Sequence, residues 1–156
     1  MGLHTHHTVQ KLPISIDEAW AFMSSPKNLK AITPEHMGFE IRSDFFGREK
    51  MYSGQIIAYT VKPLFGIPLH WVTEITHVVE PHYFVDEQRF GPYAFWHHKH
   101  FLRPILGGVE MEDVVHYKLP FGFVGDIADV LFVKNQLKQI FDYRFVKLEA
   151  LFGKLE

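Results

Sequence analysis

Three histidines occur within four positions of the segment FGPYAFWHHKHF, at His97, His98 and His100, directly after Trp96. Imidazoles this close together suit a metal site, a general base or a polar network inside a sheet. In an extended strand, successive side chains point to opposite faces of the sheet. His98 and His100 are therefore expected on one face, and His97 on the other.

The segment from 108 to 118 predicts which of these faces is buried. One side of this strand carries polar residues: Glu110, Glu112, His116 and Lys118. The other side is mostly apolar: Val109, Met111, Asp113, Val115 and Tyr117. Such alternation is typical of an antiparallel sheet with one face on the core. Asp113 is therefore expected inside the protein.

Pairing this strand with its neighbours across Gly107-Gly108 and Gly91-Pro92 predicts the partners of the histidines. His98 is expected opposite both Asp113 and Asp86. On the outer face of the sheet, Lys99 is expected opposite Glu112. The inward polar row then has these members: Asp86, Gln88, His98, His100, Asp113 and Tyr117.

Two interpretations of this row stay open, and both can hold. One is a satisfied structural network in which His98 bridges Asp86 and Asp113. The other is a binding site in which these groups hold the polar end of a ligand. The apolar body of that ligand would lie among aromatic side chains: Trp20, Tyr59, Trp71, Phe84 and Trp96.

A metal ion held by His98, His100 and either Asp86 or Asp113 is a rival interpretation. We expect no metal ion, because histidines two apart on a strand are common without one. Two acids also more often orient an imidazole than share an ion. The N-terminal histidines, His4, His6 and His7, are expected in a solvated edge strand or end of the chain.

Covalent catalysis is not expected. The chain has no Cys and no Ser in a G-x-S-x-G elbow. If the protein is an enzyme, His98 is the candidate for proton transfer, with Asp86 and Asp113 setting its charge. The non-enzymatic interpretation is favoured.

The bulk composition predicts one soluble domain over residues 1–156. Hydrophobic residues make up 47% of the chain and charged residues 22%, which is ordinary for a globular protein. The formal net charge is −2, without a basic block, so no nucleic-acid partner is expected. No apolar run is long enough for a transmembrane helix, and no secretory core opens the chain. The cytoplasm is the expected compartment.

The order of predicted elements indicates an α+β fold. A strand at 4–14 precedes a helix opened by the capping box of Ser15 and Glu18, and a short helix follows at 26–32. Further strands are expected at 37–45, 50–62, 67–79, 82–90, 93–103 and 108–118. A long amphipathic helix is expected at 125–152, with Asp126 and Asp129 near its start, Phe141 on its buried stripe and Gly153 after it. An antiparallel sheet of about seven strands is expected to curve around that helix.

Several segments together resemble the START-like (SRPBCC) superfamily. They are LPISIDEAWAF (12–22), NLKAITP (28–34), GIPLHW (66–71), FVDEQRFGPYAFWHHKHF (84–101), MEDVVHYKLPFG (111–122) and IFDYR (140–144). Within this superfamily, the segments look like a bacterial set of uncharacterised proteins related to polyketide cyclase/dehydrase and coenzyme-Q-binding START proteins. The resemblance implies the helix-grip fold and a pocket for a hydrophobic small molecule or lipid. It implies no cofactor and no particular catalytic residue.

The favoured function is therefore binding or carriage of such a molecule. One alternative is a cyclase, dehydratase or isomerase that uses His98. Another is a protein-interaction or regulatory module. The apolar loop at 63–68 fits a lid, a membrane-contacting edge or a segment packed under the helix, and these alternatives stay open.

Overall fold

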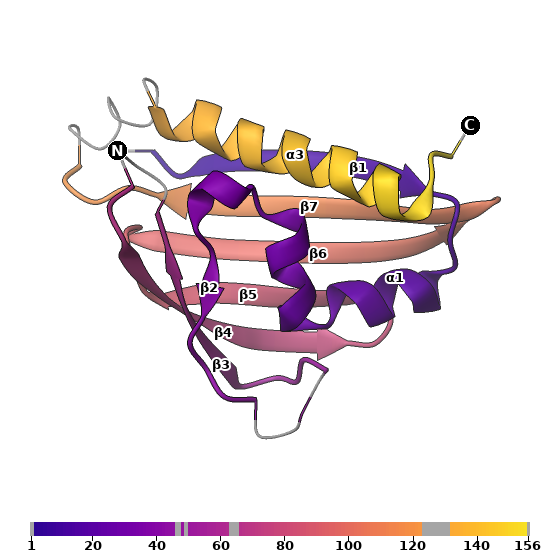
Figure 1. Cartoon of the computed structure of the whole chain (residues 1–156), viewed down its shortest axis with the longest axis horizontal. Coiled ribbons are helices and arrows are strands. Elements are labelled where there is room, and N and C mark those ends of the chain that lie inside the picture. Colours follow the sequence, from indigo (N-terminus) through magenta and orange to yellow (C-terminus); the bar gives the residue numbers. More distant parts are fainter. Residues whose placement is uncertain (1, 46–47, 49, 63–65, 123–131, 156) are drawn as a thin grey trace.

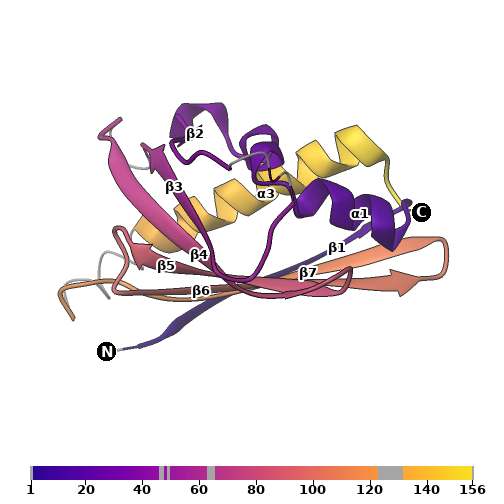
Figure 2. The same cartoon turned by 90° about the horizontal axis from the view of Figure 1, so that it is seen from below.

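Within the described residues, seven antiparallel strands form one sheet that curves around the C-terminal helix (Figures 1 and 2). The structure is a computed structural model that describes residues 2–45, 48, 50–62, 66–122 and 132–155. The strands are β1 His4–Leu12, β2 Glu40–Ile41, β3 Gln55–Val61, β4 Leu69–Val79, β5 Tyr83–Phe90, β6 Phe95–Ile105 and β7 Gly108–Lys118. Their order across the sheet is β1-β7-β6-β5-β4-β3-β2. The predicted architecture is thus confirmed.

Two short helical segments follow β1. Helix α1, Ile16–Met23, begins with the predicted capping box: Ser15 Oγ accepts from the Glu18 N–H at 3.2 Å, and Glu18 Oε2 accepts from the Ser15 N–H at 3.1 Å. The segment predicted at 26–32 is a 3₁₀ helix, η1 Pro26–Ile32, and a second short one, η2 Glu35–Met37, comes after it. These segments and the C-terminal helix lie on the same side of the sheet (Figure 2).

The C-terminal helix, α3 Lys134–Phe152, lies across the concave face of the sheet (Figure 2). Its buried residues are Leu137, Phe141, Arg144 and Leu148, which recur at the three-to-four spacing of one helix face. Residues 123–131, which include Asp126 and Asp129, lie outside the described residues. At the other end, the Gly153 N–H donates to the Glu149 carbonyl at 2.8 Å.

Two of the predicted strands are shorter than expected. The strand predicted at 37–45 is reduced to Glu40–Ile41, and the strand predicted at 50–62 begins at Gln55. The side chain of Ser43 explains the first difference. Its Oγ accepts from the Ala58 N–H at 2.6 Å, so a side chain takes the place of a backbone partner and the ladder ends there.

The predicted register between β6 and β7 is wrong by two residues. His100, not His98, pairs with Asp113, and His98 pairs with Val115. The reason is that β6 continues through Pro104 to Ile105, so the turn contains only Leu106 and Gly107. The φ angle of Gly107 is 80°, a left-handed conformation that glycine adopts without strain. Such a residue is typical of a tight hairpin turn.

A shift of two residues leaves every side chain on its predicted face. His98 and His100 are buried, whereas His97 is partly exposed. Lys99 faces Val114 instead of Glu112. The predicted Lys99–Glu112 pair is therefore replaced, and Glu112 instead contacts His7 at 3.0 Å.

Candidate functional site

A pocket of about 430 Å³ lies between the concave face of the sheet, η1 and α3. Apolar side chains dominate the described lining, including Ile57 and Ile75 from the sheet and Leu137 from α3. The alternation of β3 and β4 places these sheet residues inward, and the stripe of α3 covers them. The pocket is the space that remains because one helix does not fill so wide a curved sheet.

Aromatic side chains form one wall of this pocket. Tyr59 stacks on Trp71 at 5.8 Å between ring centroids, and Trp96 meets Trp71 edge-on at 5.1 Å. Thr73 satisfies the polar atoms of this wall, because Trp71 Nε1 donates to its Oγ1 at 3.0 Å and the Tyr59 hydroxyl lies 3.3 Å from the same atom. Burial raises the pKa of Tyr59, so its hydroxyl stays neutral. The wall therefore offers flat, uncharged surface to a ligand.

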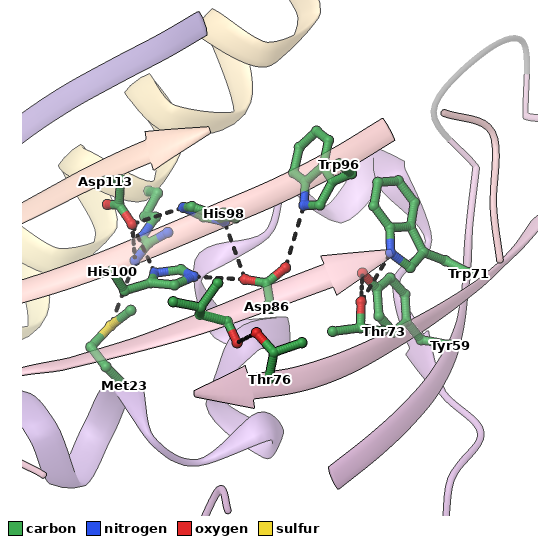
Figure 3. A network of polar contacts seen from close by, with 12 residues as sticks. Met23, Tyr59, Trp71, Thr73, Thr76, Asp86, Trp96, His98, His100 and Asp113 are labelled. Carbon is green, nitrogen blue, oxygen red and sulfur yellow. Dashed lines mark hydrogen bonds and ion pairs between the residues drawn. The ribbon is translucent and has the colours of Figure 1, made fainter. Parts of the chain in front are cut away.

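A cluster of two histidines and two aspartates lies at the polar side of the pocket (Figure 3). His98 Nε2 hydrogen-bonds Asp113 Oδ1 at 3.0 Å, and His98 Nδ1 lies 3.4 Å from Asp86 Oδ1. His100 Nε2 hydrogen-bonds Asp86 Oδ1 at 2.8 Å, and His100 Nδ1 lies 2.8 Å from Asp113 Oδ1. Both imidazoles thus bridge the same two carboxylates. We call these four residues the His–Asp cluster.

Arg144 of α3 completes the charges around the cluster. Its Nη2 lies 3.4 Å from Asp113 Oδ1, and the residue is only 7% exposed. Burial would raise the pKa of Asp113, but the Arg144 guanidinium and the two imidazoles outweigh it and hold that pKa well below its usual range. Asp113 is therefore a fixed carboxylate behind the histidines.

The surroundings of the two histidines shift their pKa values in opposite directions. Burial and the neighbouring imidazole of His100 lower the pKa of His98, against the opposing effect of the carboxylates. Burial alone would lower the pKa of His100, but its bonds to Asp113 and Asp86 outweigh burial and raise it. Burial would likewise raise the pKa of Asp86, but the nearby His98 imidazole and the bond from His100 outweigh burial and lower that pKa. These opposite shifts favour a proton on His100 over one on His98.

Three groups of the cluster could hold a cation. One oxygen of Asp86 and one nitrogen each from His98 and His100 all lie within 4.8 Å of one another. All three residues line the pocket, whereas Asp113 does not. Trp96 Nε1 donates to Asp86 Oδ2 at 3.3 Å, which leaves Oδ1 to face the imidazoles.

The pocket is lined by most of the residues predicted for it: Tyr59, Trp71, Phe84, Asp86, Trp96, His98, His100 and Phe141. Trp20, Gln88, Asp113 and Tyr117 do not line it, so their predicted place on the wall is corrected. Trp20 instead packs edge-on against Phe84 in the core beside α1, at 5.9 Å.

Two further corrections follow from local contacts. The Gln88 side chain accepts from the Tyr93 N–H at 3.1 Å and donates to the Tyr93 carbonyl at 2.7 Å, which closes the hairpin rather than facing the pocket. Tyr117 is 2% exposed and lies beneath Tyr93 and His4, with ring centroids at 5.9 and 5.3 Å.

Sequence reasoning did not single out Arg144 as a site residue. A signal existed, because Arg144 lies three residues after Phe141 and four before Leu148, on the buried stripe of α3. A cation at such a position needs a buried acid, and Asp113 was already expected inside.

The N-terminal histidines lie in β1, which is an edge strand of the sheet, as the sequence predicted. His6 packs on the Phe141 ring at 4.6 Å, and burial lowers the pKa of His6. His7 faces outward to Glu112. In the loop expected at the pocket mouth, residues 63–65 lie outside the described part of the chain.

No protein-family model matches the chain, and no curated protein matches it significantly. Solved structures do resemble it over nearly the whole length. Protein CV1439 from Chromobacterium violaceum has a TM-score of 0.71 at 13% identity, over 97% of this chain and 98% of that one. Protein Ms6760 from Mycobacterium smegmatis has a TM-score of 0.66 at 15% identity, over 97% and 98%. Ara h 8.0201 has a TM-score of 0.62 at 15% identity, over 96% and 99%.

These similarities, together with the sheet order and α3, show a helix-grip fold. At such low identity they establish the fold alone. Among the described residues, no helix is long and apolar enough to cross a bilayer.

Proposed function

We propose that the protein binds or carries a hydrophobic small molecule or lipid in its pocket. The observation that supports this most strongly is the pocket itself, about 430 Å³ of mostly apolar lining with the His–Asp cluster on one side. Ligand pockets of proteins span roughly 300–1,000 Å³ and combine apolar walls with a few placed polar groups. The apolar wall would supply most of the affinity, and Asp86, His98 and His100 would fix the orientation.

Native mass spectrometry after mild purification tests this proposal directly. A co-purifying molecule of defined mass is expected, and a neutral apolar dye such as Nile red should displace it. If neither a retained molecule nor saturable dye binding is found, the carrier proposal is refuted.

A matched pair of variants on α3 locates the binding. Ile140 lines the pocket and is only half-buried, so Ile140→Trp should reduce the pocket volume without a large change in the core. Val146 is 65% exposed on the same helix, so Val146→Trp is the control. Dye affinity should fall at least tenfold for the first variant and stay unchanged for the second. Equal affinities would place the ligand elsewhere.

Proton-transfer catalysis is a second candidate, and the observation that favours it is a buried imidazole on the pocket wall between two acids. The variant His98→Asn separates the two functions. For a carrier, this variant loses stability and binds modestly more weakly, because two acids lose a shared partner. For an enzyme, binding persists while turnover falls by roughly 10²–10⁴-fold.

The family branch and the cellular setting are also part of the proposal. We propose that the chain belongs to the bacterial branch related to polyketide cyclases and acts in the cytoplasm as a single domain. A net charge of −2 without a basic block supports the absence of a nucleic-acid partner. A regulatory interaction module is the remaining alternative. A stable protein partner together with an empty pocket would favour it over the carrier.

A further inference from the structure

We propose that Asp86, His98 and His100 form a binding site for one divalent transition-metal ion at the wall of the pocket. The sequence alone favoured a metal-free network in which one imidazole bridges the two acids. The observed register changes that expectation, because it gives both imidazoles a carboxylate on each side. The inference does not depend on the identity of any apolar ligand.

Two of the three distances between the ligand atoms fit a metal ion, and the three groups offer ligand atoms within 4.8 Å of one another. Ligand atoms bound at about 2.0–2.1 Å, with angles of roughly 90–110° between them, lie about 2.9–3.4 Å apart. Asp86 Oδ1 lies 2.8 Å from His100 Nε2 and 3.4 Å from His98 Nδ1. An ion can therefore replace the proton now shared by Asp86 and His100 with only small side-chain movements.

Asp113 supplies the outer contacts that metal-binding imidazoles usually have. It accepts from His98 Nε2 at 3.0 Å, and its Oδ1 lies 2.8 Å from His100 Nδ1. A carboxylate on one ring nitrogen fixes the tautomer, so the lone pair is on the other nitrogen. Here those other nitrogens, His98 Nδ1 and His100 Nε2, are the two that face Asp86. Arg144 keeps Asp113 ionised and is thereby a positioning residue for the site.

The chemistry of the three ligands selects the class of ion. Two imidazoles with one carboxylate suit Zn²⁺, Co²⁺ or Fe²⁺ better than Mg²⁺ or Ca²⁺, which prefer all-oxygen sites. Three protein ligands leave at least one position open. The ligating residues line the pocket while Asp113 lies behind them. The open position therefore faces the space in which an apolar ligand would lie.

Titration of the full chain, purified without a histidine tag, with Co²⁺ alone tests the proposal. We expect one tightly bound Co²⁺ per chain, visible d–d absorption, and displacement by one equivalent of Zn²⁺. Asp86→Asn and His98→Gln should each weaken binding at least tenfold. Asp113→Asn should weaken it about 10–100-fold, as loss of an outer partner does, and shift the Co²⁺ bands.

The controls are histidines outside the cluster. His97→Gln on the outer face of β6 and His7→Gln on β1 should retain the affinity and spectrum of the parent. Absence of tight Co²⁺ binding would overturn the proposal. Binding that survives Asp86→Asn and is lost in His7→Gln would also overturn it, and would indicate an adventitious surface ion only.

A measurement on the unmodified protein covers the case in which a variant does not fold. Zn²⁺ should shift the ¹⁵N resonances of the His98 and His100 imidazoles and leave those of His97 in place. If the His97 resonances shift and those of His98 and His100 do not, the proposed site is wrong. Dye binding to the pocket remains a separate readout, so failure of the metal site leaves the carrier proposal intact.

Discussion

Replacing Arg144 by methionine should destabilise the protein by about 3–5 kcal/mol, because it leaves the carboxylate of Asp113 buried without its permanent cation. Arg144 Nη2 lies 3.4 Å from Asp113 Oδ1, and both side chains are at most 10% exposed. At that separation and an effective dielectric constant near 20, the attraction is about 5 kcal/mol. Methionine keeps much of the apolar contact of the arginine stem, so the loss reports mainly the charge.

The assay is urea unfolding of the metal-free parent and variants at pH 7, followed by circular dichroism. Lys138→Met is the control on the same helix, because its ion pair with Asp142 is largely exposed. Such exposed pairs contribute less than about 1 kcal/mol. The double variant Arg144→Met/Asp113→Asn should recover part of the loss, since it removes the unpaired charge as well as its partner. An unfolding free energy of Arg144→Met within about 1 kcal/mol of the parent would refute the view that Arg144 balances the cluster.

Three further predictions concern the fold and its response to acid. Phe141→Ala should cost about 3–5 kcal/mol of unfolding free energy in the same assay. Phe141 is 8% exposed and packs on His6 and His98, whereas Phe145 is 39% exposed, so Phe145→Ala should cost clearly less. Gly108→Ala should prevent or strongly weaken folding, because a Cβ there would collide with the Leu12 carbonyl oxygen. The thermal midpoint measures this, and an unchanged value would contradict the β1–β7 packing. The folded pKa of Asp113 lies below its ordinary value of 3.8. Its stabilising contribution is therefore complete above that pH and is lost as pH falls through the folded pKa. Below about pH 4, the unfolding free energy of the metal-free parent should fall more steeply with pH than that of Asp113→Asn. Parallel curves for the two proteins would contradict a stabilising role of the Asp113 charge.

Side-chain alternation was enough to predict which residues face the interior. Strand β7, which carries Asp113, alternates along its whole length, and β6 alternates around His98 and His100, so the hydrophobic pattern decides which face is buried. The order of the strands predicted the antiparallel sheet, and the three-to-four spacing of apolar residues predicted its helix. The prediction of the buried face does not depend on the position of the hairpin turn, so it was correct although the predicted turn was wrong.

The register depended on the turn itself, and there the sequence was ambiguous. The predicted strand ended at 103, directly before Pro104, and proline is rare in central strands. In the structure, β6 continues past Pro104 to a turn of two residues. The pairing of His100 with Asp113 could therefore not be derived. The roles of Trp20 and Gln88 could not be derived either. Side-chain alternation predicts the face of the sheet on which a residue lies, but not whether that residue lines a pocket or packs against other side chains.

Burying the charged groups of the His–Asp cluster costs desolvation free energy, and this makes a purely structural role a weak explanation for the cluster. Replacing buried ionic groups by well-packed apolar side chains of similar volume is often neutral or stabilising. The surrounding core, with Phe84 stacked on His100 at 4.1 Å and Phe141 against His98 at 5.7 Å, offers ample apolar contact for such replacements. The fold therefore does not need two acids, two imidazoles and a guanidinium at this place. Their arrangement becomes intelligible if Asp86, His98 and His100 present lone pairs to the pocket while Asp113 and Arg144 hold them in position, which is what either a polar ligand end or a metal ion would require.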